Sequence, residues 1–332
     1  MISNTLKKLN DLFGREINYL RISLTDRCNL NCFYCEPSRC YEKFPKREIL
    51  SVEEIIYLVS IFYDKFGIKK FRFTGGEPLL RHGLKEIILG VRKNLGDYVE
   101  LTITTNGIFL KNFAKFLKDT KVRVNVSLDT LKEERFKKIT GCYGLSNVIS
   151  AIDYAKNLGL QLKINTVLLR EINDDEIPEL INFSRENEVK IRFIEFMPIS
   201  IDLNLWRKHF ISEEEILDTI KKKHELRFLG IEGIERIYLV DGGVEIGFIS
   251  TVSHPFCKGC SRIRISSEGK IYLCLFDHKG YDIKKFLRPE IKEEELCNII
   301  SDVVKFKPEG FIKFKEEGTL PEFGPVMKQV GG

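Results

Sequence analysis

Short strand-like runs alternate with helical stretches between residues 18 and 196, and this alternation constrains the fold more than any other feature. The predicted strands are residues 18–24, 69–74, 99–104, 122–128, 161–168 and 190–196. The predicted helices are residues 52–66, 83–94, 110–118, 147–157 and 174–186, the first with Ser51 as N-cap and Glu54 completing a capping box. Consecutive strand–helix units imply an α/β fold, a parallel sheet with helices outside it. Spacing alone fits both a partial (β/α)6 barrel of the TIM type and an open doubly wound sheet.

Polar side chains recur along these strands at every second position. Strands covered by helices are usually apolar throughout, and period-two spacing places each polar set on one face of its strand. Taken alone, each of these residues could reach solvent at a strand end. Six strands with the same pattern favour a barrel with a polar, cationic lumen, which an anionic ligand would neutralise because buried unpaired cations are costly. The residues are Arg21, Ser23 and Thr25; Lys70, Arg72 and Thr74; Thr102, Thr104 and Asn106; Asn125 and Ser127; Lys163 and Asn165; and Arg192.

The pattern changes after residue 198. A helix at residues 212–223 precedes short β runs at 226–229, 236–240, 244–250, 262–266 and 270–275. Turn sequences between these runs suggest hairpins. We therefore predict a partial barrel domain over residues 1–229 and a smaller region containing antiparallel strands over residues 230–332.

Composition limits the classes of partner. The chain is 43% hydrophobic, enough for a sizeable core, and its net charge of +5 is a mild bias. Such a charge suits an anionic small substrate better than nucleic acid. The longest nearly apolar run, residues 55–63, is too short to span a bilayer, and residues 1–16 do not resemble a signal peptide. We expect a cytoplasmic protein with no membrane or nucleic-acid partner.

Six of the nine cysteines form two tight groups. The first group is Cys28, Cys32 and Cys35, and the second is Cys257, Cys260 and Cys274. Clustered thiolates repel each other unless a metal neutralises them, so both groups are candidate metal sites. Cys40, Cys142 and Cys297 stand apart, and we interpret them as small buried hydrophobic residues.

The first group has the spacing C-x3-C-x2-C and follows the first predicted strand, so it lies at the C-terminal mouth of the predicted barrel. Three thiolates without a fourth ligand suit a [4Fe–4S] cluster with one open iron, whereas a closed zinc site requires four ligands. Cys40 is the only plausible fourth ligand nearby.

Together with Thr74-Gly75-Gly76-Glu77-Pro78 after the second strand, this motif resembles the radical S-adenosylmethionine (SAM) superfamily. The resemblance implies that the open iron chelates SAM. One electron then cleaves SAM to methionine and a 5′-deoxyadenosyl radical. It also implies that the two glycines let the backbone approach the methionine moiety, where a Cβ would clash.

The second group has the spacing C-x2-C-x13-C. On spacing alone it could be a zinc ribbon with His278 or His254 as the fourth ligand. However, Arg262 and Arg264 follow Cys260 on one face of a predicted strand and would add to the cationic lumen.

This combination is similar to the molybdenum-cofactor biosynthesis protein A family, the GTP 3′,8-cyclases. The similarity covers nearly the whole chain and includes the segments at residues 20–26, 124–129 and 192–198. It implies that the second group also holds a [4Fe–4S] cluster, whose open iron binds the guanine of GTP. The 5′-deoxyadenosyl radical would remove the C3′ hydrogen of GTP, C3′ would bond to C8, and reduction would give 3′,8-cyclo-7,8-dihydro-GTP, the first step of molybdenum cofactor biosynthesis.

The resemblance also assigns individual residues. Residues matching SAM contacts are Tyr34, Gly76, Ser127 and Met197, and those matching GTP contacts are Arg21, Arg72, Thr104, Lys163, Arg262 and Arg264. Strand parity adds Lys70, Asn165 and Arg192 as GTP contacts. Arg21 and the terminal pair Gly331-Gly332 are expected to shape the reductive half of the reaction.

Family expectations for partners are an electron donor such as a ferredoxin or flavodoxin, a second copy of the chain, and the downstream cyclic pyranopterin monophosphate synthase. One alternative is a peptide-modifying radical enzyme with two clusters, which would need a wide groove and no cationic lumen. Another is a zinc or nucleic-acid-binding protein without catalytic activity, which predicts zinc and no iron.

Overall fold

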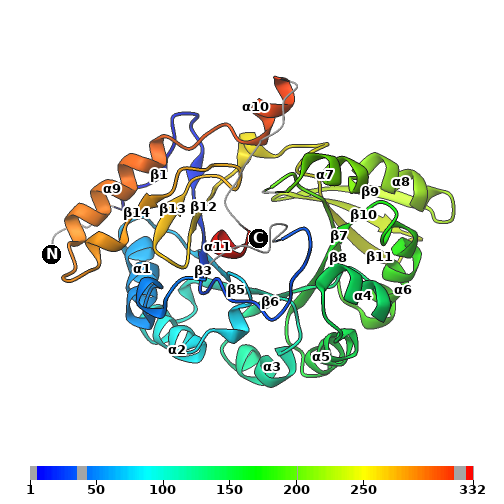
Figure 1. The fold of residues 1–332 in the computed structure, drawn as a ribbon, viewed down its shortest axis with the longest axis horizontal. Coiled ribbons are helices and arrows are strands. Elements are labelled where there is room, and N and C mark those ends of the chain that lie inside the picture. Colours follow the sequence, from blue (N-terminus) through cyan, green and yellow to red (C-terminus); the bar gives the residue numbers. More distant parts are fainter. Residues whose placement is uncertain (1–5, 36–42, 200, 318–326, 332) are drawn as a thin grey trace.

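Parallel strands in chain order form the centre of one curved sheet. The computed structural model describes residues 6–35, 43–199, 201–317 and 327–331. The central strands are β3 (Tyr19–Ser23), β4 (Lys70–Thr74), β5 (Glu100–Thr105), β6 (Arg123–Ser127), β7 (Leu162–Leu168) and β8 (Ile191–Glu195). Each pairs in parallel with the next, and the sheet curves around the C-terminal end of the chain (Figure 1). All of the strands predicted before residue 198 are confirmed.

Helices cover the outer, convex side of this sheet (Figure 1). They are α1 (Val52–Asp64), α2 (Leu84–Leu95), α3 (Leu110–Asp119), α4 (Glu133–Thr140), α5 (Leu145–Asn157) and α6 (Ile177–Asn187). The predicted capping box at Ser51 and Glu54 is present at the start of α1. The sequence did not predict α4, a short and highly charged helix that buries only Phe136, Ile139 and Thr140.

The alternation along β4 shows why one face of the sheet is polar. Phe71 and Phe73 are fully buried in the core, while Arg72 between them lies on the concave side and lines a cavity. Adjacent strand residues point to opposite faces, so the apolar set packs against the helices and the polar set is directed inward.

The C-terminal strands include the predicted antiparallel pairs, but they extend the central sheet instead of forming a sheet of their own. β12 (Arg262–Ile265) joins one edge of the central sheet in parallel with β3, and β11 (Val244–Ile249) joins the other edge in parallel with β8. Only β9 (Leu226–Glu232), β10 (Glu235–Val240), β13 (Lys270–Tyr272) and β14 (Tyr281–Asp282) pair purely antiparallel beyond them. Within the described residues this makes one sheet of 12 strands, and the domain boundary at residue 229 stays a prediction.

The remaining elements surround this sheet. They are the strands β1 (Leu9–Asn10) and β2 (Glu16–Ile17) and the helices α7 (Leu203–His209), α8 (Glu213–Lys221), α9 (Glu293–Lys305), α10 (Phe311–Glu316) and α11 (Met327–Val330). Short 3₁₀ turns occur at residues 46–48, 78–80, 96–98, 174–176, 257–259 and 284–286. Figure 1 shows α11 inside the curve of the sheet. Among the helices of the described ranges, none has the length and apolar content needed to cross a membrane.

A buried carboxylate attaches the β10–β11 hairpin to the rest of the fold. Glu213, the first residue of α8, accepts hydrogen bonds from Arg236 Nε and Tyr238 OH on β10, both at 2.8 Å. It also accepts one from Ser250 Oγ, directly after β11. Its side chain is completely shielded from solvent, so these bonds replace the hydration that the carboxylate loses.

We expect Glu213→Ala to lower the free energy of unfolding by about 3 kcal/mol, because it leaves Arg236 and two hydroxyl groups without their shared acceptor. Urea denaturation followed by circular dichroism measures this change. The adjacent Glu214→Ala is the matched control, since Glu214 is half exposed and its ion pair is with the exposed His254, and it should change stability by less than about 1 kcal/mol. Equal effects of the two substitutions would contradict the anchoring role of Glu213.

Candidate active site

The concave side of the sheet encloses a cavity of about 950 Å³. Its lining includes every residue that the sequence assigned to a cluster, to SAM or to GTP. The wider set predicted from strand parity also lines the cavity, with two exceptions. Ser23 and Thr25 are buried away from it: Ser23 Oγ donates to the carbonyl of Thr25, and Thr25 Oγ1 accepts from Arg27 N. The parity prediction fails for these two because the backbone of Gly75 packs against Ser23 Oγ and the carbonyl oxygen of Thr25, and Thr25 lies beyond the end of β3.

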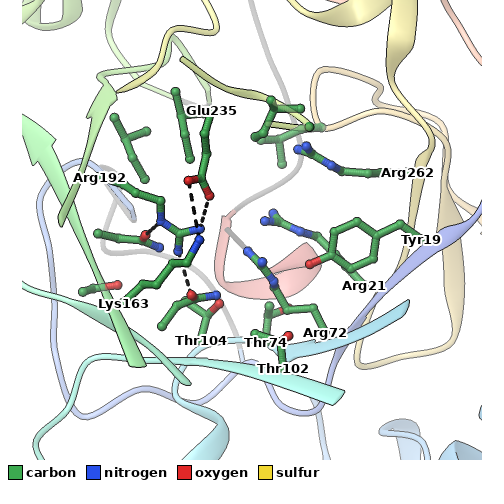
Figure 2. Close-up of a pocket in the computed structure, with 18 of the residues that line it drawn as sticks. Tyr19, Arg21, Arg72, Thr74, Thr102, Thr104, Lys163, Arg192, Glu235 and Arg262 are labelled. Carbon is green, nitrogen blue, oxygen red and sulfur yellow. Dashed lines mark hydrogen bonds and ion pairs between the residues drawn. The ribbon is translucent and has the colours of Figure 1, made fainter. Parts of the chain in front are cut away.

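Four arginines on one wall of the cavity have no carboxylate partner in the part of the chain that the structure describes. Arg264, Arg21 and Arg72 are direct neighbours across β12, β3 and β4, and Arg262 lies beside Tyr19. None of the four takes part in an ion pair between described residues. The pKa of Arg21 and that of Arg72 are both lowered to about 10, mainly by burial, and the neighbouring cations Arg262 and Arg21, respectively, contribute to the shift. We call these four arginines the unpaired wall; Figure 2 shows three of them, Arg21, Arg72 and Arg262.

Aromatic and hydrogen-bonding groups only partly compensate these arginines. The guanidinium groups of Arg72 and Arg262 lie over the ring of Tyr19, at 5.5 and 5.8 Å from its centroid. The Nε atoms of Arg21 and Arg72 and the hydroxyl of Thr104 are buried without a hydrogen-bond partner. Unpartnered donors around a cavity are the groups that a bound anion would satisfy. Tyr19 was not predicted, although it shares strand parity with Arg21.

The opposite wall contains cations that are already neutralised. Arg192 Nη1 donates to Glu235 Oε1 at 2.7 Å, and Lys163 Nζ lies 3.6 Å from Glu235 Oε2 (Figure 2). Arg192 also donates to the side-chain oxygens of Asn165 and Asn125, at 2.8 and 2.6 Å. Nothing in the sequence indicated Glu235, because it begins a strand whose place in the sheet could not be predicted.

The first cysteine group lies in the loop after β3, at the predicted mouth of the cavity. Cys28 Sγ accepts from Leu30 N at 3.4 Å and lies 3.8 Å from Asn106 Nδ2. Burial raises the pKa of Cys32 well above its usual value, and the neighbouring thiols Cys35 and Cys28 raise it further. Holding several thiolates here therefore requires a compensating positive charge, which an iron–sulfur cluster supplies.

Gly75 and Gly76 let two chain segments pack closely. A Cβ on Gly76 would lie 2.3 Å from the carbonyl oxygen of Arg27, and one on Gly75, where φ is +136°, would lie 2.3 Å from that of Thr25. Gly76 N donates to Thr25 O at 2.7 Å. The glycines thus fix the start of the cysteine loop against the end of β4, a structural need independent of the expected approach to methionine.

Buried carboxylates orient the residues around this loop. Glu77 accepts from Thr105 Oγ1 and from Asn106 N, at 2.8 and 2.7 Å, and burial raises its pKa to about 7. Tyr34 OH donates to Asp129 at 2.5 Å. The side chain of Tyr34, between Cys32 and Cys35, is therefore fixed at the edge of the cavity.

The second cysteine group faces the same cavity and is supported by two buried cations that the sequence did not reveal. Arg15, paired with Asp11 at 2.5 Å, donates to the carbonyls of Cys257 and Lys307. Lys307 Nζ in turn donates to the carbonyls of Arg262 and Leu273. Burial raises the pKa of the Cys260 thiol, but Lys307 and Arg262 more than offset this and lower it below its usual value.

Gly310 packs directly against this group. Its φ is +88°, and a Cβ there would lie 2.9 Å from Cys257 Sγ and 3.8 Å from Cys274 Sγ. Both thiols are therefore close neighbours on one side of the cavity. Neither of the alternative zinc ligands lines it, since His254 pairs with Glu214 and His278 is exposed.

The three isolated cysteines lie apart from the two groups in sequence. Cys142 and Cys297 are half buried against the core rather than fully buried, and Cys40 lies outside the described residues. Within the described ranges, no three Cys, His, Asp or Glu side chains converge closely enough to hold a single metal ion. A four-iron cluster binds each thiolate at a different iron, so its ligands do not need to converge on one ion.

The C-terminal segment enters the cavity. Arg264 Nη1 donates to the carbonyl oxygen of Gly331, and Lys328 Nζ donates to Leu30 O at 3.3 Å. The α-carbon of Gly331 lies so close to Thr74 that any Cβ would overlap the threonine side chain. Gly331 thus reaches the cavity lining as expected, while Gly332 lies outside the described residues.

Comparisons with known proteins agree with this geometry. The radical SAM superfamily model matches residues 22–184, and the model named Molybdenum Cofactor Synthesis C matches residues 189–312. The GTP 3′,8-cyclase of Thermodesulfovibrio yellowstonii is 42% identical and covers 98% of this chain and 100% of its own. That of Campylobacter jejuni is 41% identical over 91% and 93% of the two chains.

The fold also resembles that of solved structures with low sequence identity to this chain. The crystal structure of Streptococcus suis SuiB bound to S-adenosylmethionine superposes with a TM-score of 0.58 and 17% identity, over 95% of this chain and 75% of that one. The predicted radical SAM type of α/β fold is confirmed. By its full-length similarity to curated relatives, this chain belongs to the GTP 3′,8-cyclase family of the radical SAM superfamily.

Proposed function

We propose that this chain is a GTP 3′,8-cyclase that converts GTP to (8S)-3′,8-cyclo-7,8-dihydroguanosine 5′-triphosphate, the first step of molybdenum cofactor biosynthesis. The observation that supports it best is that two cysteine groups and four unpaired arginines line one cavity. Two iron–sulfur clusters and an anionic nucleotide would then share one enclosed space, as a radical cyclisation requires.

The residues around the first cysteine group fit SAM and its cluster. Cys28, Cys32 and Cys35 would hold a [4Fe–4S] cluster, and the proposed SAM contacts are Tyr34, Gly76, Ser127 and Met197. When bound, the cluster and SAM supply the one-electron chemistry that removes a hydrogen atom from C3′ of GTP. The chain contributes a fixed loop, because Gly76 and Glu77 join it to β4 and β5 through backbone and carboxylate hydrogen bonds.

The second group, Cys257, Cys260 and Cys274, fits a second [4Fe–4S] cluster, which in the family binds guanine. Lys307 and Arg262 favour thiolates at this position because their positive charges stabilise the deprotonated form. Arg15 fixes the backbone of Cys257, so the ligand loop keeps its position relative to β12.

The unpaired wall fits the triphosphate. Guanidinium groups bind phosphate oxygens through paired hydrogen bonds, and burial here removes competing water. The proposed GTP contacts are Arg21, Arg72, Thr104, Lys163, Arg262 and Arg264, with Lys70, Asn165 and Arg192 as further ones. Arg21 and Gly331 would also shape the reductive half-reaction. Three donors of Arg192 already bond to neighbouring side chains, so its contribution is mainly to hold that wall in place.

Three expectations about the partners of this chain are also part of the proposal. They are an electron donor such as a ferredoxin or flavodoxin, a homodimer, and transfer of the product to a cyclic pyranopterin monophosphate synthase. A cytoplasmic location is likewise proposed. The peptide-modifying alternative is disfavoured, because a peptide does not require four unpaired arginines.

The proposed reaction is tested anaerobically. After cluster reconstitution, the chain is incubated with SAM and a reductant, and 5′-deoxyadenosine is quantified with GTP, with ATP or without nucleotide. We expect GTP alone to raise 5′-deoxyadenosine formation, together with a cyclised product of unchanged phosphate content. Cleavage of SAM without preference for GTP would leave a radical enzyme but reject the cyclase.

Arg72→Ala is expected to weaken GTP binding about tenfold to a hundredfold, because it removes a buried charge-assisted contact worth about 1.5–3 kcal/mol. Equilibrium dialysis under anaerobic conditions measures the affinity, and iron content should stay unchanged. Lys115→Ala removes an exposed charge on α3 and is the control. Wild-type GTP affinity in the Arg72 variant would reject the unpaired wall as the phosphate site.

Gly310→Ala should disrupt the second cluster selectively, because a Cβ would strike Cys257 Sγ and the positive φ is strained for alanine. We expect the reconstituted variant to lose about half of its iron. Gly259→Ala, within the same cysteine motif but with no atom within 4 Å of its Cβ position, is the matched control. Iron analysis and cluster spectroscopy compare them; full iron content in the Gly310 variant would contradict the packing argument.

A further inference from the structure

The cations of the cavity differ in how they are neutralised. The unpaired wall, Arg21, Arg72, Arg262 and Arg264, has no carboxylate within ion-pair distance among the described residues. On the other side Lys163 and Arg192, together with Lys190, which is not part of the cavity lining, lie within ion-pair distance of one carboxylate, that of Glu235. Glu235 lies on the cavity surface at the start of β10, and Figure 2 shows its carboxylate directed toward Lys163 and Arg192.

The contacts of Glu235 are unequal. Its Oε1 accepts from Arg192 Nη1 at 2.7 Å, a charge-assisted hydrogen bond between two buried groups. Its Oε2 is buried without a hydrogen-bond partner and lies 3.6 Å from Lys163 Nζ and 3.9 Å from Lys190 Nζ. One oxygen therefore holds Arg192, while the other contributes charge alone.

Gly247 on β11 leaves just enough room for the ion pair between Arg192 and Glu235. A Cβ on Gly247 of β11 would lie 3.1 Å from Arg192 Cγ and 3.4 Å from Glu235 Oε2. Burial by itself raises the pKa of Glu235, but Arg192, Lys163 and Lys190 more than offset this and lower it. Glu235 is therefore negatively charged at neutral pH.

We propose that Glu235 is a built-in counter-ion that positions Arg192 and limits how strongly the cavity binds the polyphosphate of its substrate. This inference rests on the proposed function, because it takes GTP as the ligand and Lys163 as one of its contacts. A phosphate that approaches Lys163 meets the positive lysine and the negative Oε2 together. The attraction is thereby reduced, and the reduction grows with the charge that the ligand carries.

A purely structural role makes a different prediction. If Glu235 only attached the hairpin to β8, its loss would loosen the cavity and weaken neutral and charged ligands alike. As a counter-ion, it opposes anions and has no effect on a neutral nucleoside. The dependence on ligand charge therefore separates the two roles.

The test compares E235Q with the wild type as cluster-reconstituted full-length chains, by anaerobic equilibrium binding. Glutamine keeps the shape and an oxygen acceptor for Arg192 but removes the charge. We expect GTP and inorganic tripolyphosphate to bind about tenfold more tightly to the variant, GMP to gain less, and guanosine to be unchanged. E245Q is the matched control, since Glu245 pairs with the same Lys190 from outside the cavity lining, and its affinities should equal those of the wild type.

The gain for tripolyphosphate should also shrink as salt concentration rises, because ions screen the charge that Glu235 supplies. Equal weakening of GTP and guanosine in E235Q, or unchanged affinity for GTP and tripolyphosphate, would overturn the counter-ion role. A wild type that binds neither GTP nor tripolyphosphate would instead reject the proposed function, and this inference with it. The wild-type measurement therefore tests the proposed function, and the comparison with E235Q tests the counter-ion role.

Discussion

The structure depends on four arginines that line the cavity and have no carboxylate partner within the part of the chain that is described. Arg264, Arg21 and Arg72 occupy directly paired positions on three adjacent parallel strands, so their charges repel one another across the sheet. Burying such groups costs several kcal/mol each unless something compensates them. The rest of the fold provides partial compensation through the ring of Tyr19 and the carbonyl of Gly331, neither of which cancels charge. A polyanionic ligand would neutralise the positive charge that remains.

This arrangement requires the C-terminal strands, which join both edges of the central sheet. β12 brings Arg262 and Arg264 beside β3, and the β10–β11 hairpin brings Glu235 to the opposite edge beside β8. The same connection places Cys257, Cys260 and Cys274 in the lining of the cavity that also contains Cys28, Cys32 and Cys35. A cavity lined by two cysteine groups is therefore a consequence of how the C-terminal strands extend the sheet.

Local sequence patterns predicted the central strands, most helices and the inward-facing residues, because hydrophobic periodicity and capping act over a few residues. Arg72 between Phe71 and Phe73 is an example in which alternation alone determines the direction of the side chain. The errors arise where distant contacts decide. Ser23 leaves the pattern because the strand ends there, the parallel pairing of β11 and β12 links residues far apart in sequence, and Glu235 becomes a site residue only through that pairing. The two cysteine groups were proposed as cluster ligands from their spacing, whereas Arg15 and Lys307, which hold the second group in place, carry no local signal.

Arg15 and Arg72 show how a structural arginine differs from one that awaits a ligand. Arg15 is buried and Arg72 is partly buried at the cavity surface, and the two differ mainly in their partners. Arg15 pairs with Asp11 and donates to three backbone carbonyls, which leaves its charge and its donors satisfied within the protein. Arg72 has no carboxylate partner among the described residues; its guanidinium lies over an aromatic ring, and its Nε has no hydrogen-bond partner there. A folded chain tolerates such a group only where the gain on binding outweighs the loss of stability. The uncompensated charge of Arg72 is thus available to bind an anion. Glu235 on the facing wall carries the opposite charge and limits the affinity of the cavity for that anion.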